Sequence, residues 1–181
     1  MKSLDRILQG WRIAKAAPWV RAGDRLLDIG CYDRSLIDRV HERVASAVGI
    51  DVLTEGADDE KVRIVQGSFP DDLAAPPESF DCITALAVFE HVEDPRAFAR
   101  ACHRLLSPGG RTVLTVPHPA VDAILAGLIR LRVADGMAEE QHHGFDVTAT
   151  PSFFELEGLS LRAATRFQLG LNRLFVFEKA A

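Results

Sequence analysis

A short apolar run that ends on an acid and a glycine constrains the fold of this chain more than any other feature. Residues 25–30 read Arg-Leu-Leu-Asp-Ile-Gly, and a helix-like stretch follows after residues 31–35. Glycine lets the backbone approach a ligand closely, and the following helix presents unpaired N–H groups. This pattern is typical of the first strand-to-helix turn of a nucleotide-binding α/β fold. We therefore predict a ligand across the carboxyl end of this strand.

A second acid follows at the spacing that such a site requires. The apolar run at residues 47–51 ends in Asp51, 21 residues after Gly30. From this position a carboxylate accepts hydrogen bonds from both hydroxyls of a ribose. The alternative is a turn or helix-capping role for Asp51, which its place directly after an apolar strand disfavours. The two strand-end acids predict a crevice for a cofactor that contains ribose.

The glycine spacing distinguishes between cofactors. A dinucleotide fingerprint requires Gly-x-Gly-x-x-Gly to bring a pyrophosphate onto the helix, and here Tyr32 and Ser35 occupy the second and third glycine positions. A nicotinamide dehydrogenase is therefore disfavoured. A ligand with a ribose and no phosphate needs fewer glycines.

Composition narrows the class of protein. A chain of 181 residues with 48% hydrophobic content predicts a single domain over residues 1–181. A net charge of −5 with scattered arginines predicts no nucleic-acid partner. Three cysteines without Cys-x-x-Cys spacing favour buried thiols in a reducing compartment. No apolar run approaches the roughly 20 residues of a membrane span, and the N-terminus lacks a signal-peptide pattern, so we predict a cytoplasmic protein.

Hydrophobic periodicity predicts how helices and strands alternate. Apolar residues at helical spacing predict an amphipathic helix over residues 3–16. This helix would act as a brace on the sheet edge or as a flap over the ligand, in which case Trp11 or Trp19 would touch it. Apolar runs predict strands at residues 25–30, 46–51, 62–66, 80–87 and 111–116.

Helices separate the later runs, and a pair of strands closes the chain. Asp94-Pro95 predicts an N-cap followed by proline at the first helical position, and residues 107–110 predict a turn that ends this helix. A short helix around residues 152–157 precedes strands at residues 156–165 and 174–177. We therefore predict an α/β fold with a mostly parallel seven-stranded sheet and helices on both faces.

Three further segments carry a resemblance to a known family. They read Ser-Phe-Asp-Cys-Ile-Thr at residues 79–84, Phe-Glu-His-Val-Glu-Asp-Pro-Arg-Ala-Phe at residues 89–98, and Leu-Leu-Ser-Pro-Gly-Gly-Arg-Thr-Val-Leu-Thr-Val-Pro at residues 105–117. Together with Asp-x-Gly and the downstream Gly-x-Asp, they resemble the class I S-adenosylmethionine-dependent methyltransferases. The similarity is greatest to the ubiquinone and sugar group of small-molecule enzymes and covers roughly residues 22–178. The fold expected is therefore Rossmann-like.

The resemblance implies S-adenosylmethionine as the cofactor and assigns residues to it. The usual family motif is Asp-x-Gly-x-Gly-x-Gly, of which this chain keeps the first glycine and has Tyr32 and Arg34 at the next two. Gly30 and the backbone near Cys31 would approach the methionine part, and Asp51 with the adjacent Val52 would hold the ribose. Ser68 and Phe69 would border the adenine. Ala85 and Leu86 would line the cofactor through their backbone, and Asp28 would organise the loop after the first strand.

The acceptor side is predicted from position alone. If the acceptor is a hydroxyl, a base assists the transfer, and His118 and the pair His142-His143 are the candidates. A structural turn between two prolines is the alternative for His118, and a surface loop is the alternative for the pair. A metal site that adds Asp146 to the pair has unspecific spacing, so we predict none.

The segment at residues 118–150 is interpreted as an acceptor-facing insertion. Residues 121–133 are strongly apolar and would cap the active site or form a dimer surface. With Met137 and Phe145 they would make an apolar pocket that favours a small or lipid-like acceptor. The leading hypothesis is a methyltransferase that acts on a small molecule, most plausibly at oxygen. The alternative is a degenerate relative that kept the fold as a binding or scaffolding protein, for which Tyr32, Arg34 and Ser68 speak.

Overall fold

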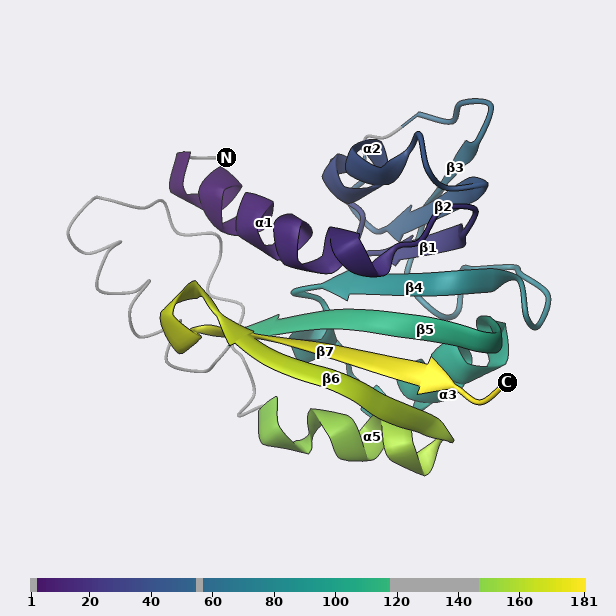
Figure 1. Ribbon diagram of the computed structural model, residues 1–181. Helices are drawn as coiled ribbons and strands as arrows, with labels where there is room; N and C mark the ends of the chain where they lie inside the picture. The colour runs from purple at the N-terminus through teal and green to yellow at the C-terminus, as the bar shows by residue number, and fades with distance from the viewer. Residues whose placement is uncertain (1–2, 55–56, 118–146) are drawn as a thin grey trace.

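A seven-stranded sheet forms the centre of the computed structural model, which describes residues 3–54, 57–117 and 147–181 (Figure 1). The strand order is β3-β2-β1-β4-β5-β7-β6, and the first five strands in this order are parallel. β7 pairs with β5 and with β6 in the antiparallel sense. The strands are β1 Arg25–Ile29, β2 Ser46–Asp51, β3 Val62–Gln66, β4 Phe80–Leu86, β5 Leu106–Pro117, β6 Leu159–Phe167 and β7 Asn172–Lys179. The predicted mostly parallel sheet is confirmed.

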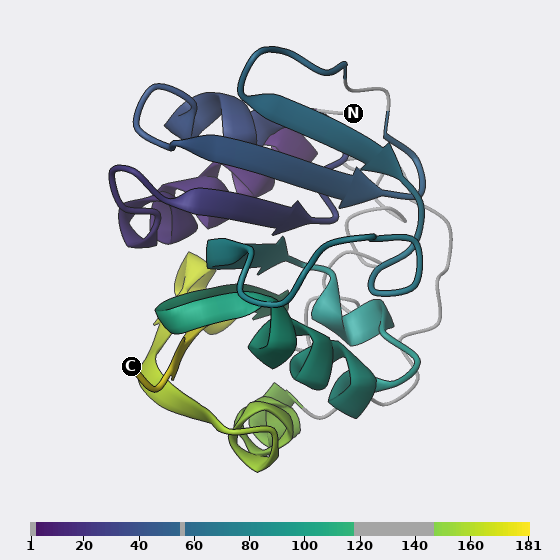
Figure 2. The same cartoon turned by 90° about the vertical axis from the view of Figure 1, so that its right-hand side faces the viewer.

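Helices cover both faces of the sheet. α1 (Ser3–Ala16) and α2 (Ser35–Val40) lie on one face, and α3 (Pro95–Leu105) and α5 (Thr150–Leu156) lie on the other (Figures 1 and 2). Consecutive strand residues serve different cores: Leu26 packs with the residues under α2, and Leu27 packs with those under α3 and α5. This is why the central strands are apolar at successive positions rather than at alternate ones.

An aromatic cluster fills the core beneath α3 and α5. Phe89 and Phe98 meet edge to face with ring centroids 5.3 Å apart, and Phe154 stacks on Phe177 at 4.4 Å. These rings come from a short 3-10 helix at Phe89–His91, from α3 and α5, and from β7. The contacts between the rings fix α3 and α5 against β7. They stabilise the fold beyond the free energy gained from burying the rings.

The start of α3 follows the prediction, but its end does not. Asp94 caps the helix by accepting hydrogen bonds from the N–H groups of Arg96 and Ala97. The predicted turn at residues 107–110 is wrong, because β5 begins at Leu106, directly after the helix. A register shift separates the pairs Phe80–Leu106 and Cys82–Arg111, and Gly109 has a positive φ of 72°. The residues typical of turns therefore form a bulge inside the strand.

The bounds of the two closing strands also differ from the prediction. Residue 156 was expected to start a strand, but it is the last residue of α5, and β6 begins at Leu159 after Gly158 turns the chain with φ +87°. β7 extends from Asn172 to Lys179, beyond the predicted range at both ends. Both differences arise because strand ends are set by pairing with neighbours rather than by local hydrophobicity.

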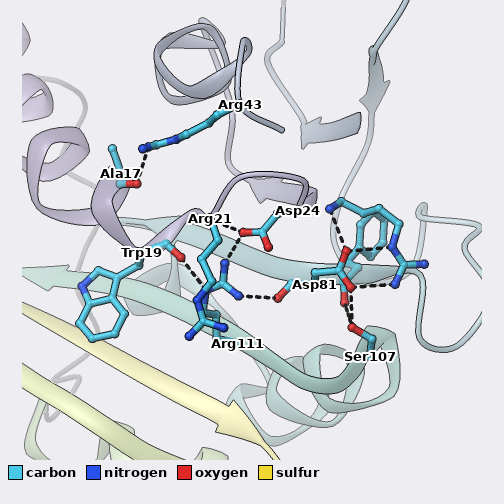
Figure 3. Close-up of polar contacts among 10 residues, drawn as sticks. Ala17, Trp19, Arg21, Asp24, Arg43, Asp81, Ser107 and Arg111 are labelled. Atoms are coloured by element: carbon cyan, nitrogen blue, oxygen red, sulfur yellow. Dashed lines mark hydrogen bonds and ion pairs between the residues drawn. The ribbon is translucent and has the colours of Figure 1, made fainter. Parts of the chain in front are cut away.

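Buried charges hold the segment between α1 and β1 on the sheet (Figure 3). Arg111 of β5 forms an ion pair with Asp24, and its Nε donates to the carbonyl oxygen of Trp19. The side chains of Arg111 and Asp24 are 3% and 7% exposed. Nearby, Asp81 accepts two hydrogen bonds from the Arg25 guanidinium. The end of α1 is thereby anchored at the edge of the sheet where the parallel strands begin.

The structure also bears on two predictions from composition. Cys31, Cys82 and Cys102 are buried and form no disulfide, as predicted. Burial raises the pKa of Cys31 and of Cys82 to about 12, which keeps both thiols protonated. Within residues 3–54, 57–117 and 147–181, no helix is long and apolar enough to cross a membrane.

Candidate functional site

The predicted cofactor residues meet at one edge of the sheet. β3, β2, β1 and β4 are neighbours in that order and parallel, so the loops that follow them lie side by side. Chain connections reverse direction between β1 and β4, and ligands of open α/β sheets bind in the crevice at such a switch point. Gly30, Asp51, Ser68 and Leu86 are each the last residue of one of these strands or lie within two residues of its end.

Gly30 has no room for a side chain. Its φ is +73°, and a Cβ placed on it would lie 2.3 Å from Cγ2 of Val88. Val88 reaches this place because the chain turns after β4 at Ala87, which has a positive φ of 58° and whose N–H donates to the Thr115 carbonyl. The glycine therefore permits contact between the loops after β1 and β4. Sequence reasoning did not single out Val88, because nothing local marks it as a neighbour of Gly30.

Tyr32 and Arg34, which stand at two glycine positions of the family motif, both have a positive φ. Their φ values are 35° and 62°, in the left-handed region that costs a residue with a side chain roughly 1 kcal/mol. Two residues with side chains therefore take a backbone conformation that favours glycine. This weakens the alternative of a degenerate relative, which depended on these positions.

Asp51 lies between the loops that follow β1 and β2. One carboxylate oxygen accepts a hydrogen bond from the Tyr32 N–H at 3.0 Å, and the other accepts from the Leu53 N–H at 2.8 Å. The group is half-buried. A carboxylate offers about four acceptor sites, so two remain for the hydroxyls of a ligand. The geometry thus combines the turn role with an orientation that suits ribose binding.

Asp28 is a buried residue of β1 that supports the carboxyl ends of β1 and β4. It is 4% exposed, and the Thr84 hydroxyl donates to its Oδ1 at 2.6 Å across the β1–β4 pair. Burial raises the pKa of this carboxyl from 3.8 to about 7. An acid buried in this way supports the loop and is poorly placed to contact a ligand.

We expect Asp28→Asn to remove a pH dependence of stability. Between pH 3.8 and about 7, the native carboxyl holds a proton that the unfolded chain has released, so the free energy of unfolding falls as pH rises through this window. The variant cannot titrate there, so its stability relative to the wild type should increase from pH 5 to pH 8. Urea denaturation at both values measures this. A constant difference, or an equal change in the exposed control Asp71→Asn, would contradict it.

The remaining predicted cofactor residues differ in what they offer. Ser68 is exposed, and its N–H donates to Asp72 at 2.7 Å, so Asp72 shapes this loop although sequence reasoning assigned it no site role. Phe69 packs edge to face on Phe98 with 5.0 Å between centroids. The Cys31 thiol is buried near Gly49, which leaves only its backbone near the edge.

The last three of these residues lie on β4 and in the loop after β2. Val52 is 56% exposed, Ala85 is buried, and Leu86 is partly buried. Val52 therefore offers a side chain at the edge, whereas Ala85 offers its backbone. These assignments remain predictions.

A cavity of about 680 Å³ lies between α1 and the loop after β1. Gln9 of α1 donates a hydrogen bond to Asp33 at 3.0 Å, which places the helix beside this loop and suits the flap interpretation. The half-exposed Tyr32 ring lines the cavity, whereas Trp11 and Trp19 do not. The lining residues are Arg6, Gln9, Gly10, Ile13, Ala14, Tyr32, Asp33, Ser35 and Arg39.

The predicted acceptor residues lie outside the described residues. These are His118, His142 and His143, together with the apolar segment at residues 121–133, Met137, Phe145 and the weighed metal ligand Asp146. Within the part of the chain that the structure describes, no group of three metal-ligating side chains comes together.

Comparison with known proteins assigns the family. Residues 6–163 match the family model described as a methyltransferase domain. The chain belongs to the methyltransferase-domain family. The ubiquinone biosynthesis O-methyltransferase of Pseudomonas entomophila is 30% identical to this methyltransferase domain over 143 residues. That match covers 72% of the chain and 60% of the relative, so the chain spans about 60% of the relative's length.

Solved structures confirm the fold of the methyltransferase domain. The YcgJ protein from Bacillus subtilis superposes with a TM-score of 0.70 at 20% identity, covering 95% of this chain and 99% of that one. An S-adenosylmethionine-dependent methyltransferase from Mesorhizobium loti gives a TM-score of 0.70 at 18% identity, covering 92% of this chain and 100% of that one. The predicted Rossmann-like methyltransferase fold is thereby confirmed.

Proposed function

We propose that this methyltransferase domain transfers a methyl group from S-adenosylmethionine to an oxygen atom of a small molecule. The observation that carries the proposal is the placement of Asp51 at the end of β2 beside Gly30 at the end of β1, next to the switch point between β1 and β4. There Asp51 would hold the ribose, and the backbone of Gly30 would approach the cofactor. The O-methyltransferase name of the relative from Pseudomonas entomophila supports oxygen as the acceptor atom.

The residues at the strand ends fit the cofactor. Asp51 would hold the ribose hydroxyls, because its carboxylate keeps free acceptor sites while two N–H groups orient it. Gly30 and the Val88 side chain that meets it would form the wall beside the methionine part. Asp28 would fix this wall through Thr84.

The chemistry asks little of the protein beyond placement. When bound, S-adenosylmethionine would supply the methyl carbon of its sulfonium to in-line attack by an acceptor oxygen, with S-adenosylhomocysteine as the leaving group. The protein contributes by aligning the two reactants and by excluding water. α1 lies beside the loop after β1 and would serve as the cover on this side. His118, His142 or His143 would take the proton of a hydroxyl acceptor.

The proposal extends to the setting of the enzyme. We propose a cytoplasmic protein with a small-molecule acceptor and no nucleic-acid partner, in line with a net charge of −5. The apolar segment at residues 121–133 would either cover the acceptor or join two copies as a homodimer.

Titration followed by turnover tests the proposal. Calorimetry with S-adenosylmethionine, S-adenosylhomocysteine and NAD should show binding of the first two and no binding of NAD. Incubation with S-adenosylmethionine and a panel of phenols, catechols, amines and thiols should yield S-adenosylhomocysteine and an O-methylated product by mass spectrometry. Failure to bind either sulfur ligand would overturn the proposal, and a product methylated at nitrogen or sulfur would overturn the choice of oxygen.

The three histidines are tested in the same assay. The variants His118→Ala, His142→Ala and His143→Ala are compared with His103→Ala. His103 lies in the last turn of α3, at the helix end away from the carboxyl ends of the parallel strands. A general base contributes roughly 100-fold or more, so loss of that size in one of the three and not in the control is expected. Unchanged turnover in all three would remove the assignment of a histidine base.

A further inference from the structure

Arg34 joins the loop after β1 to the loop after β2. Its guanidinium donates to the Ala57 carbonyl and forms an ion pair with Asp59 at 2.8 Å, and both partners precede β3. A third partner, Asp38, lies one helical turn away on α2 at 3.2 Å. The Arg34 side chain is only 16% exposed. This burial and the several partners distinguish it from an ordinary surface ion pair, which contributes little to stability.

Asp59, the ion-pair partner of Arg34, is itself held in place by backbone hydrogen bonds. The Asp59 Oδ1 accepts hydrogen bonds from the N–H groups of Lys61 and Val62, where β3 begins. The hydrogen bond from Arg34 holds the pKa of Asp59 well below its usual range, so the pair stays charged at neutral pH. Arg34 therefore links the β1 loop to a fixed point at the start of a strand.

The position of Asp51 depends on the same two loops. Its two oxygens accept from Tyr32 in the β1 loop and from Leu53 in the β2 loop. The Thr54 hydroxyl also donates to the Tyr32 carbonyl, at 3.2 Å. The carboxylate is thus oriented by the spacing between the loops, and Arg34 supplies the charged contacts that set this spacing.

The backbone of Arg34 has a conformation that favours glycine. A φ of 62° is strained for arginine, so Arg34→Gly would relieve this strain while it removes the side chain. We propose that Arg34 is a positioning residue that clamps the loops after β1 and β2 and thereby orients Asp51 toward the cofactor ribose. This inference rests on the proposed function, in which Asp51 holds the ribose.

Ligand discrimination tests the clamp. Calorimetry is performed with S-adenosylhomocysteine and its 2′-deoxy analogue, which lacks one hydroxyl that Asp51 would bind. One hydrogen bond to a carboxylate corresponds to roughly tenfold in affinity, so the wild type should prefer the ribose form by about that factor. In Arg34→Gly the preference should fall below about threefold, mainly through weaker binding of the ribose form.

Matched variants separate the clamp from a general effect on folding. Asp59→Asn should reproduce the loss of discrimination with Arg34 still present. Asp38→Asn removes the partner on α2, whose side chain is 61% exposed, and should retain the wild-type preference. Arg34→Lys keeps the charge and should restore part of the preference. If Arg34→Gly fails to fold, Asp59→Asn alone decides.

The outcomes are distinct. Wild-type protein that binds both ligands equally would refute the ribose role of Asp51, and with it the basis of the inference. A wild-type preference that persists in both Arg34→Gly and Asp59→Asn would overturn the clamp and leave the role of Asp51 intact. An equal loss of affinity for both ligands in these variants would also overturn it, because a structural defect does not discriminate between riboses.

Discussion

Replacing Asp51 with alanine should weaken the binding of S-adenosylhomocysteine about 100-fold. Two hydrogen bonds to a charged acceptor are lost, each worth roughly 1.5 kcal/mol, and every 1.4 kcal/mol changes a dissociation constant about tenfold. The carboxylate sits at the end of β2 with free acceptor sites, so the hydroxyls would bind it directly. Calorimetric titration of wild type and variant measures the change.

Two further variants make this result specific to the carboxylate. Asp51→Asn keeps the shape and one acceptor oxygen, so a loss of about tenfold is expected. Glu155→Gln neutralises an exposed acid on α5 and should leave the affinity unchanged. Thermal melting of the free proteins shows whether Asp51→Ala has lost the bonds to Tyr32 and Leu53 at the expense of folding. Affinity within threefold of wild type in a folded Asp51→Ala would remove Asp51 from the site.

Replacing Arg111 with methionine should destabilise the protein by about 3–5 kcal/mol, because the variant leaves the buried Asp24 carboxylate without its charge partner. Asp24 and Arg111 are 7% and 3% exposed, and Arg111 also holds the Trp19 carbonyl. A loss of 1 kcal/mol lowers the melting temperature of a domain of this size by about 2–4 °C, so a decrease of roughly 10 °C is expected. Urea denaturation measures the free energy of unfolding.

A second ion pair provides the matched control. Arg162 and Glu178 lie 3.4 Å apart with side chains 71% and 35% exposed, so Arg162→Met should cost less than about 1 kcal/mol. The double variant Asp24→Asn with Arg111→Met should recover part of the stability, because it removes the unpaired charge. Equal effects of Arg111→Met and Arg162→Met would show that burial of the pair carries no special weight.

The fold was predictable because a parallel sheet covered by helices on both faces has strands that are continuous apolar runs in the sequence. The ranges predicted for β2 and β3 agree with the structure residue for residue, and Asp94 caps α3 as expected. The errors fall where local chemistry and pairing compete. Residues 107–110 have the composition of a turn, yet they lie in β5 because Leu106 and Arg111 on either side pair with β4. Gly158 delays the start of β6.

The candidate site was predictable in part. Asp51 and Gly30 were found because each follows an apolar strand at a spacing that the nucleotide-binding turn imposes. Asp72 and Val88 were missed, since they support the loops from positions with no pattern of their own. The acceptor residues at positions 118–146 lie outside the described residues and remain predictions.

The sequence alone determined where most of the parallel strands lie, which acids follow them at their carboxyl ends, and to which family the chain belongs. Those properties are written in spacings of a few residues and in the alternation of strand and helix. Only the tertiary structure decided that Arg34 reaches Asp59, 25 residues away, and that Arg111 pairs with Asp24, 87 residues away. The reason is physical: the partner of a charged group is chosen by burial and by strand order, which no local stretch of sequence contains.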